Sequence, residues 1–118
     1  MSEQRLIIEM GMGNDLHGQD YTKAARRAIE DAFRHSSLPL FGTIGLDHDV
    51  MQVRATVAVQ DPDAVDAGAL VAVLPRGQAT VRVVKGGLNV ETDAEPIVIA
   101  QASVEAFLPP QKNWRLKR

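Results

Sequence analysis

The sequence has no cysteine among its 118 residues. Disulfides, thiolate nucleophiles and cysteine metal sites are therefore excluded, and this composition fits the reducing cytoplasm in which we expect the protein. The sequence also lacks an apolar run of the roughly 20 residues that a bilayer-spanning helix needs. The first residues, MSEQR, do not show the basic-then-apolar pattern of a signal peptide. We expect no membrane partner.

Neither sign of charge is in large excess, since the net charge is −2 at pH 7 and the isoelectric point is about 5.9. The chain has no excess of basic residues, so we expect no nucleic-acid partner. Apolar residues make up 45% and charged residues 24% of the chain, which is typical of a soluble globular protein. The length predicts one domain, which we place at residues 1–108, followed by a basic, proline-led tail at 109–118.

The hydrophobic periodicity predicts four strands and two helices in the order β-α-β-α-β-β. Asp20 is the expected N-cap of the first helix, and Asp61 followed by Pro62 is the expected start of the second. This order is typical of an α/β sandwich with a mixed sheet and helices on one face. The strands are expected at 5–12, 50–60, 79–85 and 96–108, and the helices at 21–35 and 62–71.

Two strands carry apolar residues at successive positions, Leu6-Ile7-Ile8 and Ile97-Val98-Ile99. Such runs indicate strands that are buried on both faces of a sheet. Two helices are too few to cover both faces, so a second copy of the chain is the expected cover. The sequence therefore predicts a homo-oligomer, with a trimer or a larger assembly among the expected sizes.

Most of the chemically versatile side chains lie between Glu9 and Lys23, where we expect a glycine-containing loop to join the first strand to the first helix. Glycine permits positive φ and the close approach of a ligand or another backbone segment. The helix N-terminus attracts anions through its free N–H groups and dipole. We therefore predict a site for a small anionic or polar molecule here. The candidate catalytic residues are His17, Asp15 and Lys23, and the candidate ligand-binding residues are Gly11, Gly13, Gln19, Asp20 and Thr22.

Three chemistries are open at this stretch. An anion could bind at the helix start with help from Lys23, although the spacing matches neither G-x-G-x-x-G nor G-K-[ST], and the nearby carboxylates would repel it. His17 could act as a general acid or base with Asp15 or Asp20 as its partner. A metal ion could bind Asp15 and His17 together with residues of the 47–49 turn, Asp47, His48 and Asp49.

A purely structural reading stands beside these three. In that reading the glycines form a tight turn, Asp20 only caps the helix, and His17 only makes hydrogen bonds. No complete metal-ligand set with regular spacing is present, so we predict no metal and no cofactor.

A long motif, MGMGNDLHGQDYTKAARRA at 10–28, occurs together with SLP at 37–39, LPRG at 74–77 and KGGL at 85–88. These segments resemble a small family of uncharacterised bacterial proteins whose signature is approximately M-G-x-G-x-D-x-H-G-Q-D-x-T-K-A-A. The resemblance implies a fold similar to Bacillus-type chorismate mutase, YjgF-like proteins and the C-terminal domain of tubulin. The first two form trimers with sites between subunits.

This fold-level analogy does not carry a function. From the residues themselves, the function expected here is an intersubunit small-molecule site at the loop between Gly11 and Lys23, with His17 as the candidate for acid–base catalysis. The alternative is a non-catalytic, oligomeric module that binds a ligand or a protein. The resemblance implies no settled activity, so the sequence leaves open whether the chain is an enzyme.

Overall fold

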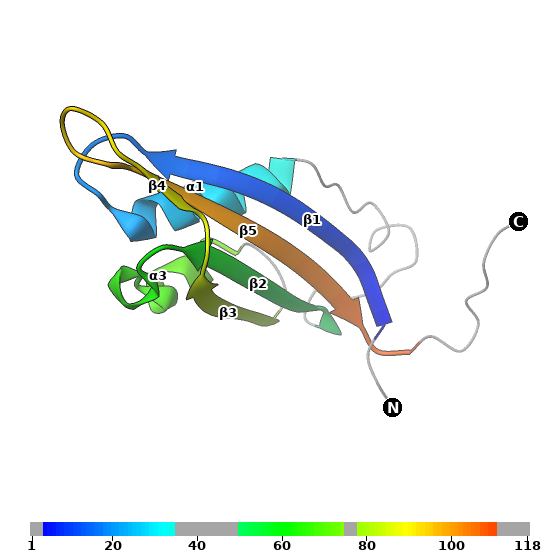
Figure 1. Cartoon of the computed structure of the whole chain (residues 1–118). Helices are drawn as coiled ribbons and strands as arrows, with labels where there is room; N and C mark the ends of the chain where they lie inside the picture. Colours follow the sequence, from blue (N-terminus) through cyan, green and yellow to red (C-terminus); the bar gives the residue numbers. More distant parts are fainter. Residues whose placement is uncertain (1–3, 35–49, 75–77, 111–118) are drawn as a thin grey trace, which may run out of the picture.

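The computed structural model describes residues 4–34, 50–74 and 78–110, which form one mixed sheet with helices on one of its faces (Figure 1). This architecture confirms the predicted fold class, an α/β sandwich. The elements in chain order are β1 (Gln4–Asp15), α1 (Tyr21–Arg34), β2 (Gln52–Val59), the 3-10 turn η2 (Pro62–Ala64), α3 (Ala67–Val71), β3 (Gln78–Lys85), β4 (Leu88–Val90) and β5 (Ile97–Leu108).

The long strand β5 lies at the centre of the sheet, whose order is β1-β5-β2-β3, and the short strand β4 also pairs with β5. β5 is antiparallel to β1, β2 and β4, whereas β2 and β3 are parallel and are joined through η2 and α3. β1 pairs with β5 from Gln4 opposite Leu108 to Asp15 opposite Val98, with one register shift between Arg5 and Ile7.

The core lies between the sheet and the helices. The alternate residues of β2 and β5 that face the helices are almost all valine or alanine and are buried, because successive side chains of a strand point to opposite faces. Helix α1 presents a stripe of small residues to the sheet, which brings its axis close to the strands. The fully buried residues of this stripe are Ala24, Ala25, Ala28, Ile29 and Ala32.

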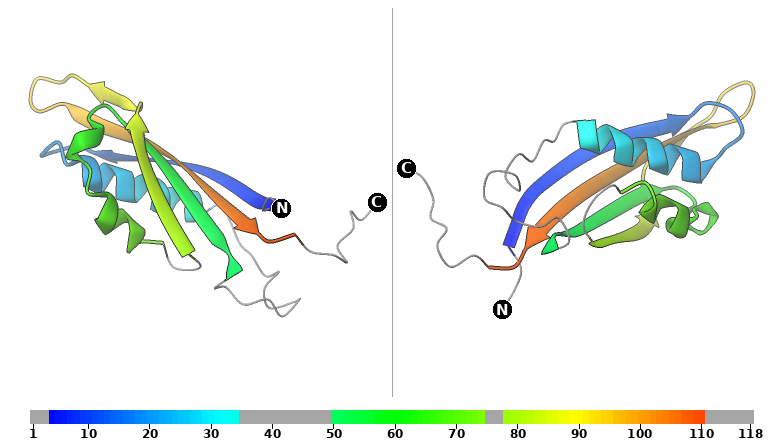
Figure 2. Two further views of the ribbon diagram at one scale, coloured as in Figure 1. Left: turned by 90° about the horizontal axis from the view of Figure 1, so that it is seen from below. Right: turned by 180° about the vertical axis from the view of Figure 1, so that it is seen from behind.

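No helix formed by the described residues covers the opposite face of the sheet, here called the open face, because α1 and α3 both lie on the core side (Figure 2). Large apolar side chains are exposed on this open face: Ile8 is 43%, Met10 67% and Met12 56% exposed on β1, and Leu88 is 55% exposed on β4. The prediction that Leu6-Ile7-Ile8 is buried on both faces is therefore wrong for Ile8 in the isolated chain. A pleated strand hides alternate residues only, and the residues described here supply no second layer.

Three further predicted elements differ from the structure. Residues 13–15 continue strand β1 beyond its predicted end at residue 12 and are not a loop, and Gly13 packs against helix α1. The second helix is divided into η2 and α3. Asp66, whose Oδ1 accepts a hydrogen bond of 3.1 Å from the Ala69 N–H, caps α3, whereas the Asp61 side chain caps nothing. Strand β4 was not predicted, since three residues are too few to show a period.

None of the helices formed by the described residues has the length and apolarity needed to cross a membrane. The predicted tail at 109–118 lies outside the described residues from position 111 onward.

Candidate functional site

The two glycines of β1 lie directly under helix α1. A Cβ atom at Gly11 would be 2.3 Å from the carbonyl oxygen of Ala28, and one at Gly13 would be 2.3 Å from the backbone nitrogen of Ala28. Real Cβ atoms do not approach backbone so closely, so only glycine allows α1 to lie at this distance from the strand. The space above Gly11 and Gly13 is thus occupied by the backbone of α1.

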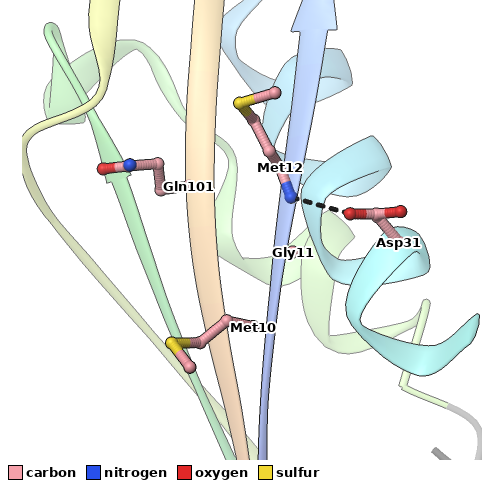
Figure 3. Close-up of a pocket in the computed structure, with 5 residues that line it drawn as sticks. All are labelled: Met10, Gly11, Met12, Asp31 and Gln101. Atoms are coloured by element: carbon pink, nitrogen blue, oxygen red, sulfur yellow. Dashed lines mark hydrogen bonds between the residues drawn. The ribbon is translucent and has the colours of Figure 1, made fainter. Parts of the chain in front are cut away.

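Two charged residues of α1 reach over the edge of β1. The Arg27 guanidinium donates a hydrogen bond of 2.7 Å to the carbonyl oxygen of Asn14. The Asp31 carboxylate accepts one of 3.0 Å from the N–H of Met12, which Figure 3 shows. β1 is an edge strand, and such strands expose backbone groups that can pair with other chains. Arg27 and Asp31 satisfy two of these groups. The sequence alone does not reveal this role, although Arg27 and Asp31 are spaced i, i+4 on the helix that follows the strand.

Asp15 is the buried acid of the candidate site, with 2% of its surface exposed. Its Oδ2 accepts a hydrogen bond of 2.9 Å from the Asp20 N–H, and its Oδ1 lies 3.2 Å from Lys23 Nζ and 3.9 Å from an Arg27 nitrogen. The hydrogen bond from the Asp20 backbone lowers the pKa of Asp15 most. Burial raises this pKa, and the charges of Lys23 and then Arg27 lower it further. The carboxylate is therefore ionised at neutral pH and connects the end of β1 to the start of α1.

Asp20 begins the helix, as predicted. Its Oδ1 accepts a hydrogen bond of 3.0 Å from the Lys23 N–H, and its carbonyl oxygen accepts one of 3.1 Å from the Ala24 N–H. This is the hydrogen bonding of an N-cap residue, which satisfies one of the free N–H groups in the first turn.

We expect Asp20→Ala to lower the free energy of unfolding by about 1 kcal/mol, because it removes the capping acceptor. Urea denaturation followed by circular dichroism measures this change. Asp20→Asn is the matched control, since asparagine also caps and should retain most of the stability. An unchanged denaturation midpoint for the alanine variant would show that the cap contributes nothing.

The turn between β1 and α1 holds the other candidate residues. His17 and Gln19 are exposed, and the Gly18 N–H donates a hydrogen bond to the Glu95 carboxylate of the β4–β5 turn. Gln19 has φ of 49°, in the left-handed region that non-glycine residues rarely adopt. The Thr22 hydroxyl accepts a hydrogen bond of 2.9 Å from the Asp66 N–H, so Thr22 joins α1 to the segment before α3.

The structure thus brings Asp15, Asp20 and Lys23 together but leaves His17 in solvent. In the parts of the chain that the structure describes, no group of three or more histidine or acidic side chains is placed to hold a metal ion. The turn residues that the metal hypothesis used, Asp47, His48 and Asp49, lie outside those parts.

A hollow of about 490 Å³ lies at the outer edge of β1, between α1 and the open face and away from the β1–α1 turn. Its wall consists of Met10, Gly11, Met12, Asp31 and Gln101. Figure 3 shows the Met10 and Met12 side chains projecting from β1 on the side where Gln101 projects from β5. The hollow is open to solvent and mainly apolar, with the Asp31 carboxylate at its edge.

A family model described as "Conserved hypothetical protein (Lin0512_fam)" matches residues 5–106, which is nearly all of this fold. The chain belongs to this family. It is also similar to a solved structure, an FtsZ-like protein of unknown function (Npun_R1471) from Nostoc punctiforme PCC 73102. The two share 38% sequence identity with a TM-score of 0.83, and the match covers 93% of this chain and 99% of that one. No curated protein matches the chain. The protein is thus a Lin0512-family member of unknown function.

Proposed function

We propose that this Lin0512-family protein is a non-catalytic module that assembles with itself, and that a second copy of the chain covers the open face of its sheet. The observation that carries the proposal is the group of exposed apolar side chains on that face. They come from β1 and β4, at the two sides of β5, and are Ile8, Met10, Met12, Leu88 and Val90. Exposed apolar groups of this kind mark interaction surfaces.

The size of the open face suits a stable interface. Each strand residue occupies about 3.3 Å by 4.8 Å of the sheet plane, so the five strands present roughly 700 Å² on one side. Specific protein interfaces bury about 800 Å² on each partner. A second sheet packed on this face would therefore provide an interface close to the standard size.

The β1–α1 turn supports a non-catalytic role. A general base needs a reachable proton and a poised acid–base group, whereas the Asp15 carboxylate is bound to the Asp20 N–H and to Lys23. The backbone of α1 occupies the space above Gly11 and Gly13, so no ligand can lie there. In this proposal the stretch from Gly11 to Lys23 holds the helix on the sheet.

We expect the wild-type protein to show the mass of an oligomer by light scattering at micromolar concentration, and Met12→Glu to weaken association by a factor of about 100 or more. An unpaired charge buried in an apolar interface costs several kcal/mol. Met12 is exposed in the single chain, so the variant should still fold.

The matched control is Val71→Glu, which places the same charge at an exposed apolar position on α3, on the opposite side of the sheet. This variant should retain the wild-type mass. A monomeric wild-type protein, or equal effects of the two variants, would contradict the proposal.

A second candidate function is a site for a small anionic or polar molecule at the β1–α1 turn, with His17 as acid–base group. The observation that favours it is the left-handed backbone of Gln19, because strained residues cluster at functional sites. His17→Asn keeps a hydrogen-bonding group and removes the imidazole that acid–base catalysis would need. For this candidate we expect the variant to keep its denaturation midpoint and to lose binding of inorganic phosphate, measured by calorimetry. Equal binding by the two proteins would exclude His17 from such a site.

A further inference from the structure

We infer that the two copies meet face to face with their β5 strands antiparallel, so that the β4–β5 turn of each copy lies over the arginines of the other. This inference rests on the proposed self-assembly and adds its orientation and its charge pairing. It follows from how apolar and charged residues are distributed along the open face, and not from the apolar area alone.

The turn at one end of the sheet is acidic. The turn between β4 and β5 carries Glu91, Asp93 and Glu95, all exposed. Within this turn the Thr92 hydroxyl donates a hydrogen bond of 2.8 Å to the Glu95 carbonyl oxygen and accepts one of 3.0 Å from the Ala94 N–H. The Glu95 carboxylate is bound to the Gly18 N–H, which leaves Glu91 and Asp93 as the acids available to a partner. Figure 1 shows this turn at the end of the sheet farthest from the C-terminal end of β5.

The other half of the face is basic. Arg54 on β2 lies opposite Glu105 of β5, and its guanidinium is 4.3 Å from the ring centre of Phe107. Arg82 on β3 lies opposite Thr56, which in turn lies opposite Ser103. The one acidic residue of β5, Glu105, is paired with Arg5 at 3.1 Å.

The apolar residues lie between these two ends. Leu88 is opposite Ile99, and Met12 and Ala58 are both opposite Gln101. From Ile97, next to the acidic turn, to Ser103, level with Arg82, the chain advances six residues, which is about 20 Å of strand. The middle of this span falls near Gln101, in the apolar section.

Consider a two-fold axis that lies between the two sheets, parallel to their planes and perpendicular to the strands, at the level of the apolar section. Such an axis places the apolar residues of one copy over the same residues of the other, and each acidic turn over the partner's arginines. Both charge contacts are then made twice, as a self-complementary interface requires. A parallel arrangement would place acid over acid and arginine over arginine, which is unfavourable. Sheets packed face to face keep their strands within about 30° of each other, so the antiparallel orientation can hold along the whole face.

The charge pairing is tested by reversing each partner. Arg82→Glu and Asp93→Lys are each expected to weaken self-association about tenfold at low salt, and the double variant, which exchanges the charges, should restore most of it. Arg26→Glu is the control, because Arg26 is on the exposed side of α1 and should not affect association. Association weakened further by the double variant would overturn the pairing.

The orientation is tested with cysteines, which the native chain lacks. Asp93→Cys and Arg82→Cys proteins are mixed and treated with a short bismaleimide, and we expect crosslinked dimers that contain one of each. Efficient crosslinking of the Asp93→Cys protein to itself would overturn the antiparallel arrangement. An oligomer that Met12→Glu dissociates but that shows such self-crosslinking would leave the proposed assembly standing and remove this orientation alone. A wild-type monomer would remove both.

Discussion

Gly13→Ala is expected to lower the free energy of unfolding by about 3 kcal/mol, near the upper end of what overpacking costs. The new methyl group would lie 2.3 Å from the Ala28 nitrogen and 2.5 Å from the Ala24 carbonyl oxygen. Both are backbone atoms of α1, so no side chain can rotate away, and the whole helix must move off the sheet. Urea denaturation measured at a fixed protein concentration gives the change in free energy.

The control for this prediction is Gly68→Ala in helix α3. The nearest atom to a Cβ at Gly68 is the Asp66 Oδ1 at 3.4 Å, an ordinary contact. Alanine is favoured over glycine inside a helix, so this variant should gain about 0.5 kcal/mol. If Gly13→Ala were as well tolerated as Gly68→Ala, the helix would not lie on the strand as described.

Asp15→Asn is expected to destabilise the protein by about 2 kcal/mol at pH 7. Asparagine has nearly the same shape but loses the charge that Lys23 and Arg27 face, and hydrogen bonds to charged groups contribute about 1.5–3 kcal/mol. The expected result is a lower denaturation midpoint with an unchanged slope. Asp63→Asn, at an exposed position of η2, is the control and should be close to neutral.

The same variant makes a prediction about pH. Asp15 has a pKa in the folded protein that lies below its ordinary value of 3.8. A carboxyl group of this kind stabilises the folded state above its unfolded-state pKa, and that contribution is lost as the pH falls through the lower folded-state pKa. The difference between wild type and Asp15→Asn should therefore be constant above about pH 5 and shrink below about pH 4. A difference that stays constant down to pH 2 would show that Asp15 acts through its shape and not through its charge.

These two predictions explain why the chemically rich stretch does not by itself indicate catalysis. Gly11 and Gly13 are needed where the helix backbone meets the strand, and Asp15 and Asp20 organise the helix start. Arg27 and Asp31 complete the arrangement from the helix side by binding the strand edge. An acid, an amine and two glycines within a short segment are thus accounted for by packing and capping.

The contact between α1 and β1 also bears on the open face. α1 and β1 form one side of the core, and β1 also contributes Met10 and Met12 to the apolar surface on the other side. In the proposed assembly, β1 would hold these side chains in place for a second sheet. The proposed assembly and the stability of the β1–α1 unit are therefore linked through one strand.

The fold class, most strand positions and the start of α1 can be predicted from the sequence alone. Alternation such as that of residues 53–59 has a single structural meaning, and Asp20 ahead of an apolar stripe is a local signal, since its cap bonds only to the next turn. The sequence also predicts that one face of the sheet needs another layer, because apolar residues occupy neighbouring positions of one strand.

The contacts of the glycines, of Asp15 and of the charged residues of α1 cannot be predicted from the sequence, because they depend on how the chain folds. A glycine in a sequence permits a turn, a ligand or a helix equally well, and the choice depends on which element is folded back over it. The same holds for Asp15, whose partners are all within 12 positions of it, yet the bonds form only when the helix lies along the strand. Local patterns specify local hydrogen bonds, whereas the burial and the contacts of a residue depend on which other segment of the chain packs against it.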